Sequence, residues 1–102
     1  MFIKALPCGY TQIGSGALIS AQTVTVLSVG TGVTSLTANM AVITAEVQSL
    51  RWRDDGTAPT AAVGNLIVTG IPFEYLGNLS ALQLIGAAAG AIANISQYHI
   101  PA

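Results

Sequence analysis

The stretch that decides the fold is AVITAEVQSLRWR, residues 41–53. In its first half, apolar side chains occupy every second position: Ile43, Ala45 and Val47. A period of two is the pattern of a β-strand with one buried face. Leu50 and Trp52 continue the apolar series on the opposite parity. One step of register moves every side chain of a strand to the other face. The change of apolar parity therefore predicts a β-bulge near residues 48–49 of one long strand.

A turn is predicted directly after this stretch, at the sequence Asp54-Asp55-Gly56. Aspartate side chains accept hydrogen bonds from nearby backbone N–H groups, and glycine adopts a positive φ at no steric cost. Paired catalytic carboxylates face each other across a substrate, whereas adjacent side chains diverge. We therefore expect Asp54 and Asp55 to cap the turn rather than to carry chemistry.

Short runs rich in Thr, Val and Ile lie on both sides, separated by Gly, Pro, Asn or Asp: 23–28, 33–37, 66–68, 71–75, 79–85 and 91–98. This spacing is typical of an all-β domain. The glycine-flanked run at residues 86–90 is expected to be a loop, because each glycine costs a helix about 1 kcal/mol. The Gly-Ser-Gly at 14–16 and the Gly-Thr-Gly at 30–32 are interpreted as hairpin turns. We predict one domain, residues 1–102, folded as a small β-sandwich or jelly roll of seven to eight short antiparallel strands.

Charged residues make up only 7% of the 102 residues, with three Lys plus Arg and four Asp plus Glu. An ordinary soluble domain carries about 25%. Intrinsic disorder is excluded, because disordered chains combine high charge with low hydrophobicity, and 52% of this chain is hydrophobic. Nucleic-acid binding is not expected, because three cations neutralise few phosphates. A single Cys and a single His exclude a disulfide framework and a zinc site built from this chain alone.

The low charge also indicates assembly, since no charged residue lies between Lys4 and Glu46 or after Glu74. Surface charge is what keeps a free monomer soluble. We expect the chain to associate with copies of itself or with a larger protein lattice. Association with lipid is the third alternative, because residues 79–96 form an uncharged run at the lower length limit of a membrane helix. The polar Ser, Gln and Asn residues within that run argue against a spanning helix.

No catalytic constellation is visible, so we expect neither an enzyme nor a cofactor, metal or small-molecule substrate. His99 stands near the C-terminus without a nearby cysteine or acid. Nucleophilic catalysis needs a nucleophile, a base and an orienting group within hydrogen-bond reach. The first residues lack the apolar core of a signal peptide, which predicts that the chain is made and kept in the cytosol, with Cys8 as a reduced and inert thiol.

The charged cluster at residues 51–55 is the main candidate site. Strand parity places Arg51 and Arg53 on one face and Trp52 on the other, facing the core or a neighbouring subunit. One interpretation is a salt-bridged turn that holds the strand end. The other is a contact patch, because Trp and Arg are enriched at interface hot spots. The two are compatible, and the candidate interface residues are Arg51, Trp52, Arg53, Tyr75 and Tyr98.

The most distinctive sequence is RWRDDGTAPT, residues 51–60, which is followed by IPFEY at 71–75, LSAL at 79–82 and ANIS at 93–96. Over about residues 45–98, this series resembles a group of small virion structural proteins of tailed bacteriophages. The first 40 residues lie outside the resemblance.

The resemblance implies a head decoration, or cement, protein on the outer capsid. Its partners would be the major capsid protein and copies of itself in a dimer or trimer. It would be synthesised in the host cytoplasm and located on the surface of the virion head. An accessory β-sandwich of the tail, neck or fibre that touches host glycans is the alternative. An exposed aromatic platform would favour that alternative, and the sequence offers Trp52, Tyr75 and Tyr98 for it. A small membrane protein is the third alternative.

Overall fold

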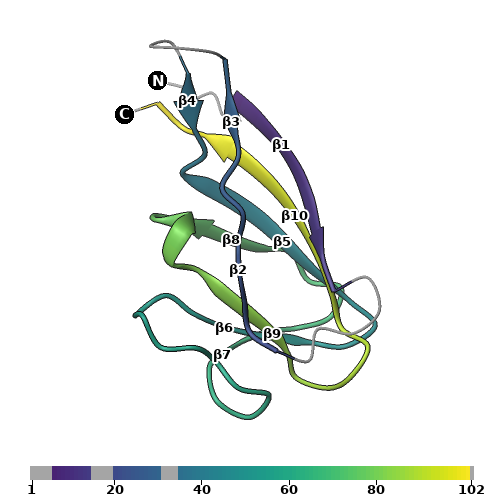
Figure 1. The fold of residues 1–102 in the computed structure, drawn as a ribbon. Helices are drawn as coiled ribbons and strands as arrows, with labels where there is room; N and C mark the ends of the chain where they lie inside the picture. Colours follow the sequence, from purple (N-terminus) through teal and green to yellow (C-terminus); the bar gives the residue numbers. More distant parts are fainter. Residues whose placement is uncertain (1–5, 15–19, 31–34, 102) are drawn as a thin grey trace.

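Two four-stranded antiparallel sheets form the body of the protein in a computed structural model that describes residues 6–14, 20–30 and 35–101 (Figure 1). Sheet A has the strand order β1 (Leu6–Ile13), β10 (Ile92–His99), β5 (Met40–Glu46) and β8 (Phe73–Leu76). Sheet B has the order β2 (Gln22–Thr23), β9 (Gln83–Gly86), β6 (Leu50–Arg53) and β7 (Asn65–Ile67). A separate two-stranded ribbon pairs β3 (Ser28–Val29) with β4 (Leu36–Thr37).

The order of the strands is that of a jelly roll. The long antiparallel pairs are β1 with β10, β2 with β9, β5 with β8, and β6 with β7. The chain therefore behaves as one long hairpin that is rolled up, so that successive pairs fall alternately in sheet A and sheet B. Eight strands connected in this way form two packed sheets, and the β3–β4 ribbon is an insertion between β2 and β5.

The core lies between the two sheets and is made of alternate side chains from both. Sheet A contributes three alanines and two isoleucines from β5 and β10: Ala41, Ile43, Ala45, Ala93 and Ile95. Sheet B contributes larger ones: Leu50, Ile67 and Leu84. Burial of such side chains is the main source of free energy for folding. The all-β sandwich predicted from the alternating sequence is confirmed, although the described residues form ten strands rather than seven or eight, three of them only two residues long.

The predicted single strand with a bulge is wrong, because the decisive stretch forms two strands in different sheets. β5 ends at Glu46 in sheet A, and β6 starts at Leu50 in sheet B. Between them the backbone turns sharply at Val47, where φ is +71°. The change of parity is real, but its cause is the crossing from one sheet to the other. Each sheet buries the face that looks at its partner, so the crossing reverses the apolar parity.

Two other predicted strands are only partly formed. Residues 79–81 form a 3₁₀ turn, η2 (Leu79–Ala81), which Asn78 caps by accepting a hydrogen bond from the Ser80 N–H, and β9 starts at Gln83. In the predicted strand 23–28, Thr23 ends β2 and Ser28 starts β3. Most of the two predicted glycine turns, at 15–16 and 31–32, lies outside the described residues.

A buried glutamine replaces a strand partner between β2 and β3. Gln97 on β10 is fully buried, and its side-chain amide donates to the carbonyl of Thr25 at 2.7 Å. Its side-chain oxygen accepts from the N–H of Leu27 at 3.0 Å. Buried backbone groups need partners. The single side chain of Gln97 therefore holds residues 25–27 against sheet A without a β-ladder.

Candidate functional site

Trp52 crosses the space between the two sheets. Its ring lies 5.3 Å from that of Phe73, centroid to centroid, and 5.7 Å from that of Tyr75 in an edge-on arrangement. Phe73 and Tyr75 both belong to β8 of sheet A. Such aromatic contacts add to the burial energy. Trp52 is therefore packed against the core of its own chain, as its strand parity indicates.

Arg51 points to the opposite side of β6 and fastens the loop that follows the strand. Its Nε donates to the carbonyl oxygen of Ala61 at 3.2 Å, and its Nη1 donates to that of Gly64 at 3.1 Å. The stem of Arg51 lies close to Gly64, where an added Cβ would sit 3.2 Å from the Arg51 Cβ. The half-buried guanidinium is thus committed to the β6–β7 connection of its own chain.

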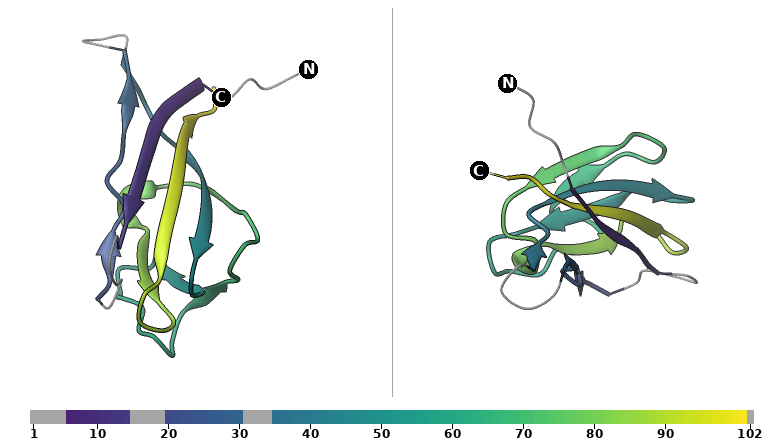
Figure 2. Two further views of the ribbon diagram at one scale, coloured as in Figure 1. Left: turned by 90° about the vertical axis from the view of Figure 1, so that its right-hand side faces the viewer. Right: turned by 90° about the horizontal axis from the view of Figure 1, so that it is seen from above.

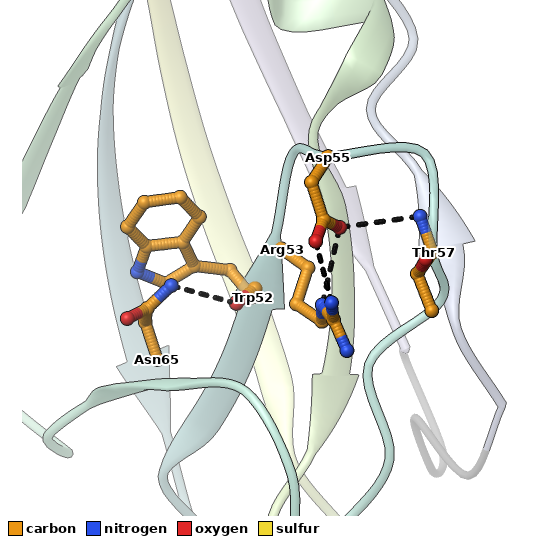
Figure 3. A network of polar contacts seen from close by, with 5 residues as sticks. All are labelled: Trp52, Arg53, Asp55, Thr57 and Asn65. Atoms are coloured by element: carbon orange, nitrogen blue, oxygen red, sulfur yellow. Dashed lines mark hydrogen bonds and ion pairs between the residues drawn. The ribbon is translucent and has the colours of Figure 1, made fainter.

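Arg53 and Asp55 form a bidentate ion pair at the end of β6 (Figure 3). Asp55 also accepts a hydrogen bond from the backbone N–H of Thr57 at 3.2 Å. The bonds from Arg53 and then from Thr57 hold the pKa of Asp55 below its ordinary value, and the same carboxylate raises the pKa of Arg53. Figure 3 shows the indole of Trp52 extending to the side away from this pair. The salt-bridged turn is present.

Tyr75 connects the same turn to the core. It is 8% exposed, and its hydroxyl donates to the Asp54 carboxylate at 2.8 Å. Burial, followed by this hydrogen bond, raises the pKa of Tyr75 to about 12. Of the two aspartates, only Asp55 bonds to turn backbone, so the capping role predicted for Asp54 is replaced by a bond to a side chain of the other sheet. Tyr75 belongs to the interior of its own chain and presents no contact surface.

Two further residues singled out in the sequence, Tyr98 and His99, lie at the end of β10. Tyr98 is half-buried on the outer face of sheet A, where β10 pairs with β1 and β5. His99 Nδ1 lies 2.7 Å from the carbonyl oxygen of Thr37, an acceptor that makes this nitrogen the donor. Within the described residues, His, Cys, Asp and Glu side chains nowhere gather in threes as a metal site would require. None of the helical segments in that part of the chain has the length and apolar character needed to cross a membrane.

A different cluster of residues emerges at the end of the sandwich where β10 begins. Three connections meet there around Ser49 of the β5–β6 turn. The Ser49 side chain lies 3.1 Å from the Thr69 hydroxyl and accepts from the Thr69 N–H at 3.2 Å. The Ser49 carbonyl accepts from the N–H of Ala87 in the β9–β10 turn at 2.8 Å. These bonds hold together three loops that are far apart in the sequence.

The surface that these loops present is mostly apolar and carries no charged side chain. We call it the uncharged tip, and its exposed side chains are all apolar except that of Thr69: Val47, Val68, Thr69, Ile71, Pro72, Ala88 and Ala89. Val47 is 65% exposed and Ile71 is 60% exposed. None of the residues 47–49, 68–72 and 87–91 is charged. In Figure 1, β10 runs from this end, at lower right, to the β3–β4 ribbon at the top.

Val47 at the centre of the tip has a strained backbone. Its φ of +71° makes it the one non-glycine residue with a positive φ in the described part of the chain. A β-branched residue in this region is an outlier that costs about 1–2 kcal/mol. Strain of this kind is retained where the surrounding structure imposes it, and such positions cluster at functional sites.

Sequence reasoning missed both the uncharged tip and an exposed aromatic residue, Tyr10. Tyr10 is 58% exposed on the outer face of sheet A. Of the predicted platform residues, Tyr75 is buried in the core and Trp52 is half-buried against it. A local signal for Tyr10 exists in the alternation of β1, where Gln12 shares its parity. The tip has no local signal beyond its lack of charge, because its parts meet only in the fold.

Comparison of the chain with protein-family models, with curated proteins and with solved structures gives no match.

Proposed function

We propose that this protein is a non-enzymatic structural protein of a phage particle, a decoration subunit that binds the outer head shell and bridges coat subunits. The observation that carries the proposal is the uncharged tip. Exposed apolar side chains grouped on a fixed surface favour contact with another protein. Rigid loops bind at a lower entropic cost than flexible ones do, and Ser49 holds these loops in place.

The distribution of charge supports attachment by this end. Arg53, Asp54 and Asp55 lie in and beside the β6–β7 connection, outside the three loops of the tip. The depletion of charge at the centre of protein interfaces matches the composition of the tip. We therefore propose that the tip faces the coat lattice and that the charged β6–β7 connection remains outside the contact.

The jelly-roll order of the strands is compatible with this role. Domains of this architecture occur in viral capsids and also in lectins. Architecture by itself does not define function, so this support is an analogy of fold. The resemblance of residues 45–98 to small virion proteins points in the same direction.

The test is a binding experiment with heads and tails that are purified separately from a phage deleted for this gene. The purified chain should cosediment with heads, and a double Val47→Ser, Ile71→Ser variant should bind about tenfold more weakly or worse. The matched control is Val63→Ser, because Val63 is a similarly exposed valine in the β6–β7 connection. It should bind as the wild type does. Binding to tails alone, or equal loss in the control, would overturn the proposal.

A second candidate is an accessory module of the tail, neck or fibre that touches host glycans. It is favoured by one observation, the exposed Tyr10 with its polar neighbours on sheet A. In the same experiment this candidate predicts that the chain cosediments with the tail fraction.

A further inference from the structure

The outer face of sheet A carries a row of polar side chains beside an exposed aromatic ring. β1, β10 and β5 lie side by side in this sheet (Figure 2). The register pairs Tyr10 with Ser96, and it places Gln12, Asn94 and Thr44 in line across the three strands. These residues alternate with the buried Ala93 and Ile95 of β10, so they point away from the core.

Hydrogen bonds join Tyr10, Gln12 and Asn94 to one another and to Glu46, which lies on the same face of β5 as Thr44. The side-chain oxygen of Asn94 accepts from the Tyr10 hydroxyl and from the Gln12 amide, the latter at 2.8 Å. The Asn94 amide donates to the Glu46 carboxylate. Asn94 therefore fixes the orientation of its three neighbours, Tyr10 and Gln12 on β1 and Glu46 on β5. Binding groups that are held in one geometry lose little entropy when a ligand arrives.

The side chains of this network retain hydrogen-bond donors and acceptors that are not used within it and that can reach a ligand. Gln12 keeps its side-chain oxygen and one amide hydrogen, and Glu46 keeps one carboxylate oxygen. The hydroxyls of Thr44 and Ser96 add groups that both donate and accept. A ligand with many hydroxyl groups fits this mixture, because each hydroxyl is itself a donor and an acceptor.

The exposed ring of Tyr10 and the charges on this face further limit the classes of ligand that the surface can bind. The face of a tyrosine ring packs well against the flat C–H surface of a sugar ring, while polar side chains at its edge meet the hydroxyls. The charged side chains that the structure describes on this face are both acidic, Glu46 and Glu74. Anionic ligands and nucleic acids would be repelled. A second copy stacked by the same face would also bring these carboxylates together.

We propose that this surface, formed by Tyr10, Gln12, Asn94 and Glu46, is a binding site for neutral carbohydrate. Tyr10 supplies the stacking platform, Gln12 and Glu46 bind hydroxyl groups, and Asn94 positions the other three. The site does not depend on which part of a particle the chain occupies, and its side chains are separate from those of the uncharged tip.

The test is electrophoresis of the folded protein through native gels that contain one polysaccharide each: dextran, mannan, galactan, soluble β-glucan or, as the anionic arm, heparin. At least one neutral polysaccharide should slow the wild type, and heparin should not. Tyr10→Ala should weaken binding by about tenfold or more, while Tyr10→Phe, which keeps the ring, should retain most of it. Gln12→Ala should weaken binding less than Tyr10→Ala does.

Leu76→Ala is the matched control, because Leu76 is an exposed apolar side chain on β8 of the same sheet. Relative to its own mobility in a gel without polysaccharide, it should be slowed as much as the wild type is. Val47→Ser should be slowed to the same extent, which separates this site from the tip. Failure of all the neutral polysaccharides to slow the protein refutes the proposal. Retardation by heparin, or undiminished binding by Tyr10→Ala, does so too.

Discussion

Gly56 and Gly64 lie in the same connection but are glycines for different reasons. Gly56 has a φ of +85° and open space around it, so only its backbone conformation requires glycine. Gly64 has a φ of +140°, and a Cβ there would lie 3.2 Å from Arg51, from Pro59 and from the Trp52 carbonyl. The backbone at that point approaches β6 as closely as a glycine permits.

We therefore predict unequal effects of the same substitution at these two positions. Gly56→Ala should cost about 1 kcal/mol of stability, the price of a left-handed conformation alone. Gly64→Ala should cost at least twice as much, because crowding adds to strain. Urea denaturation midpoints of the two variants measure the difference. Equal midpoints would show that the close packing around Gly64 is absent in solution.

Tyr75 provides a prediction about pH. Its pKa is raised to about 12, above the unfolded value near 10, so the neutral phenol is the form that the fold stabilises. This contribution is fully present below about pH 10 and is lost as the pH rises through about 12. Absorbance of tyrosinate should show one residue ionising late, and Tyr75→Phe should remove that step.

Asp54→Asn is the control for the cause of this shift. An asparagine oxygen still accepts the hydrogen bond from Tyr75, but the negative charge is gone. The pKa of Tyr75 should move part of the way back to its ordinary value. The rest of the shift should remain, because its largest cause is the burial of Tyr75, which this substitution does not change. An unchanged titration in this variant would contradict the Tyr75–Asp54 contact.

At the scale of elements, Gln97 determines where the segment between β2 and β3 lies. Gln97→Leu removes the partners of the Leu27 N–H and the Thr25 carbonyl while it keeps the volume of the side chain roughly constant. Two orphaned backbone groups should cost about 2–4 kcal/mol. Gln22→Leu, at an exposed position on β2, should change stability by about 0.5 kcal/mol or less. Thermal or urea unfolding of the two variants would decide, and similar midpoints would rule out this role of Gln97.

In the β5–β6 turn, we predict a substitution that raises stability instead of lowering it. Val47→Gly should raise the stability of the isolated chain by about 1 kcal/mol, because glycine tolerates the positive φ that strains valine. Val63→Gly is the comparison, since Val63 is similarly exposed and does not have a positive φ. It should lower stability slightly. A destabilised Val47→Gly protein would mean that the turn is not strained as described.

For the whole molecule, the apolar tip and the 7% charge content predict self-association. In the absence of another partner, the tips of two or more copies should bury their exposed valine and isoleucine side chains against each other. Light scattering at micromolar concentration should detect a dimer, a trimer or larger species. The double Val47→Ser, Ile71→Ser variant should shift toward monomer. A monodisperse monomer of the wild type would contradict self-association.

The sequence by itself determined the properties that depend on neighbouring residues. Alternation with a period of two indicated the strands and showed which side chains share a face of each strand. The position of Trp52 on the face opposite to Arg51 and Arg53 was therefore predictable. Gly56 in a turn followed from its place after two aspartates, and its φ of +85° agrees. The low charge was also visible without a structure. Each of these features depends on local backbone geometry or on composition alone.

The tertiary structure decided everything that depends on which strands become neighbours. The rolled-up pairing of strands places β5 and β6 in different sheets. It also brings Gln97 to Thr25 and Tyr10 to Asn94, residues that are far apart in sequence. The convergence of three loops on Ser49 has the same origin. Side-chain parity along one strand is fixed by local geometry, but the partner across a sheet is selected by the packing of the whole chain. The salt-bridged turn of Arg53 and Asp55 was therefore predictable from the local sequence, whereas both surfaces proposed for binding emerged only from the fold.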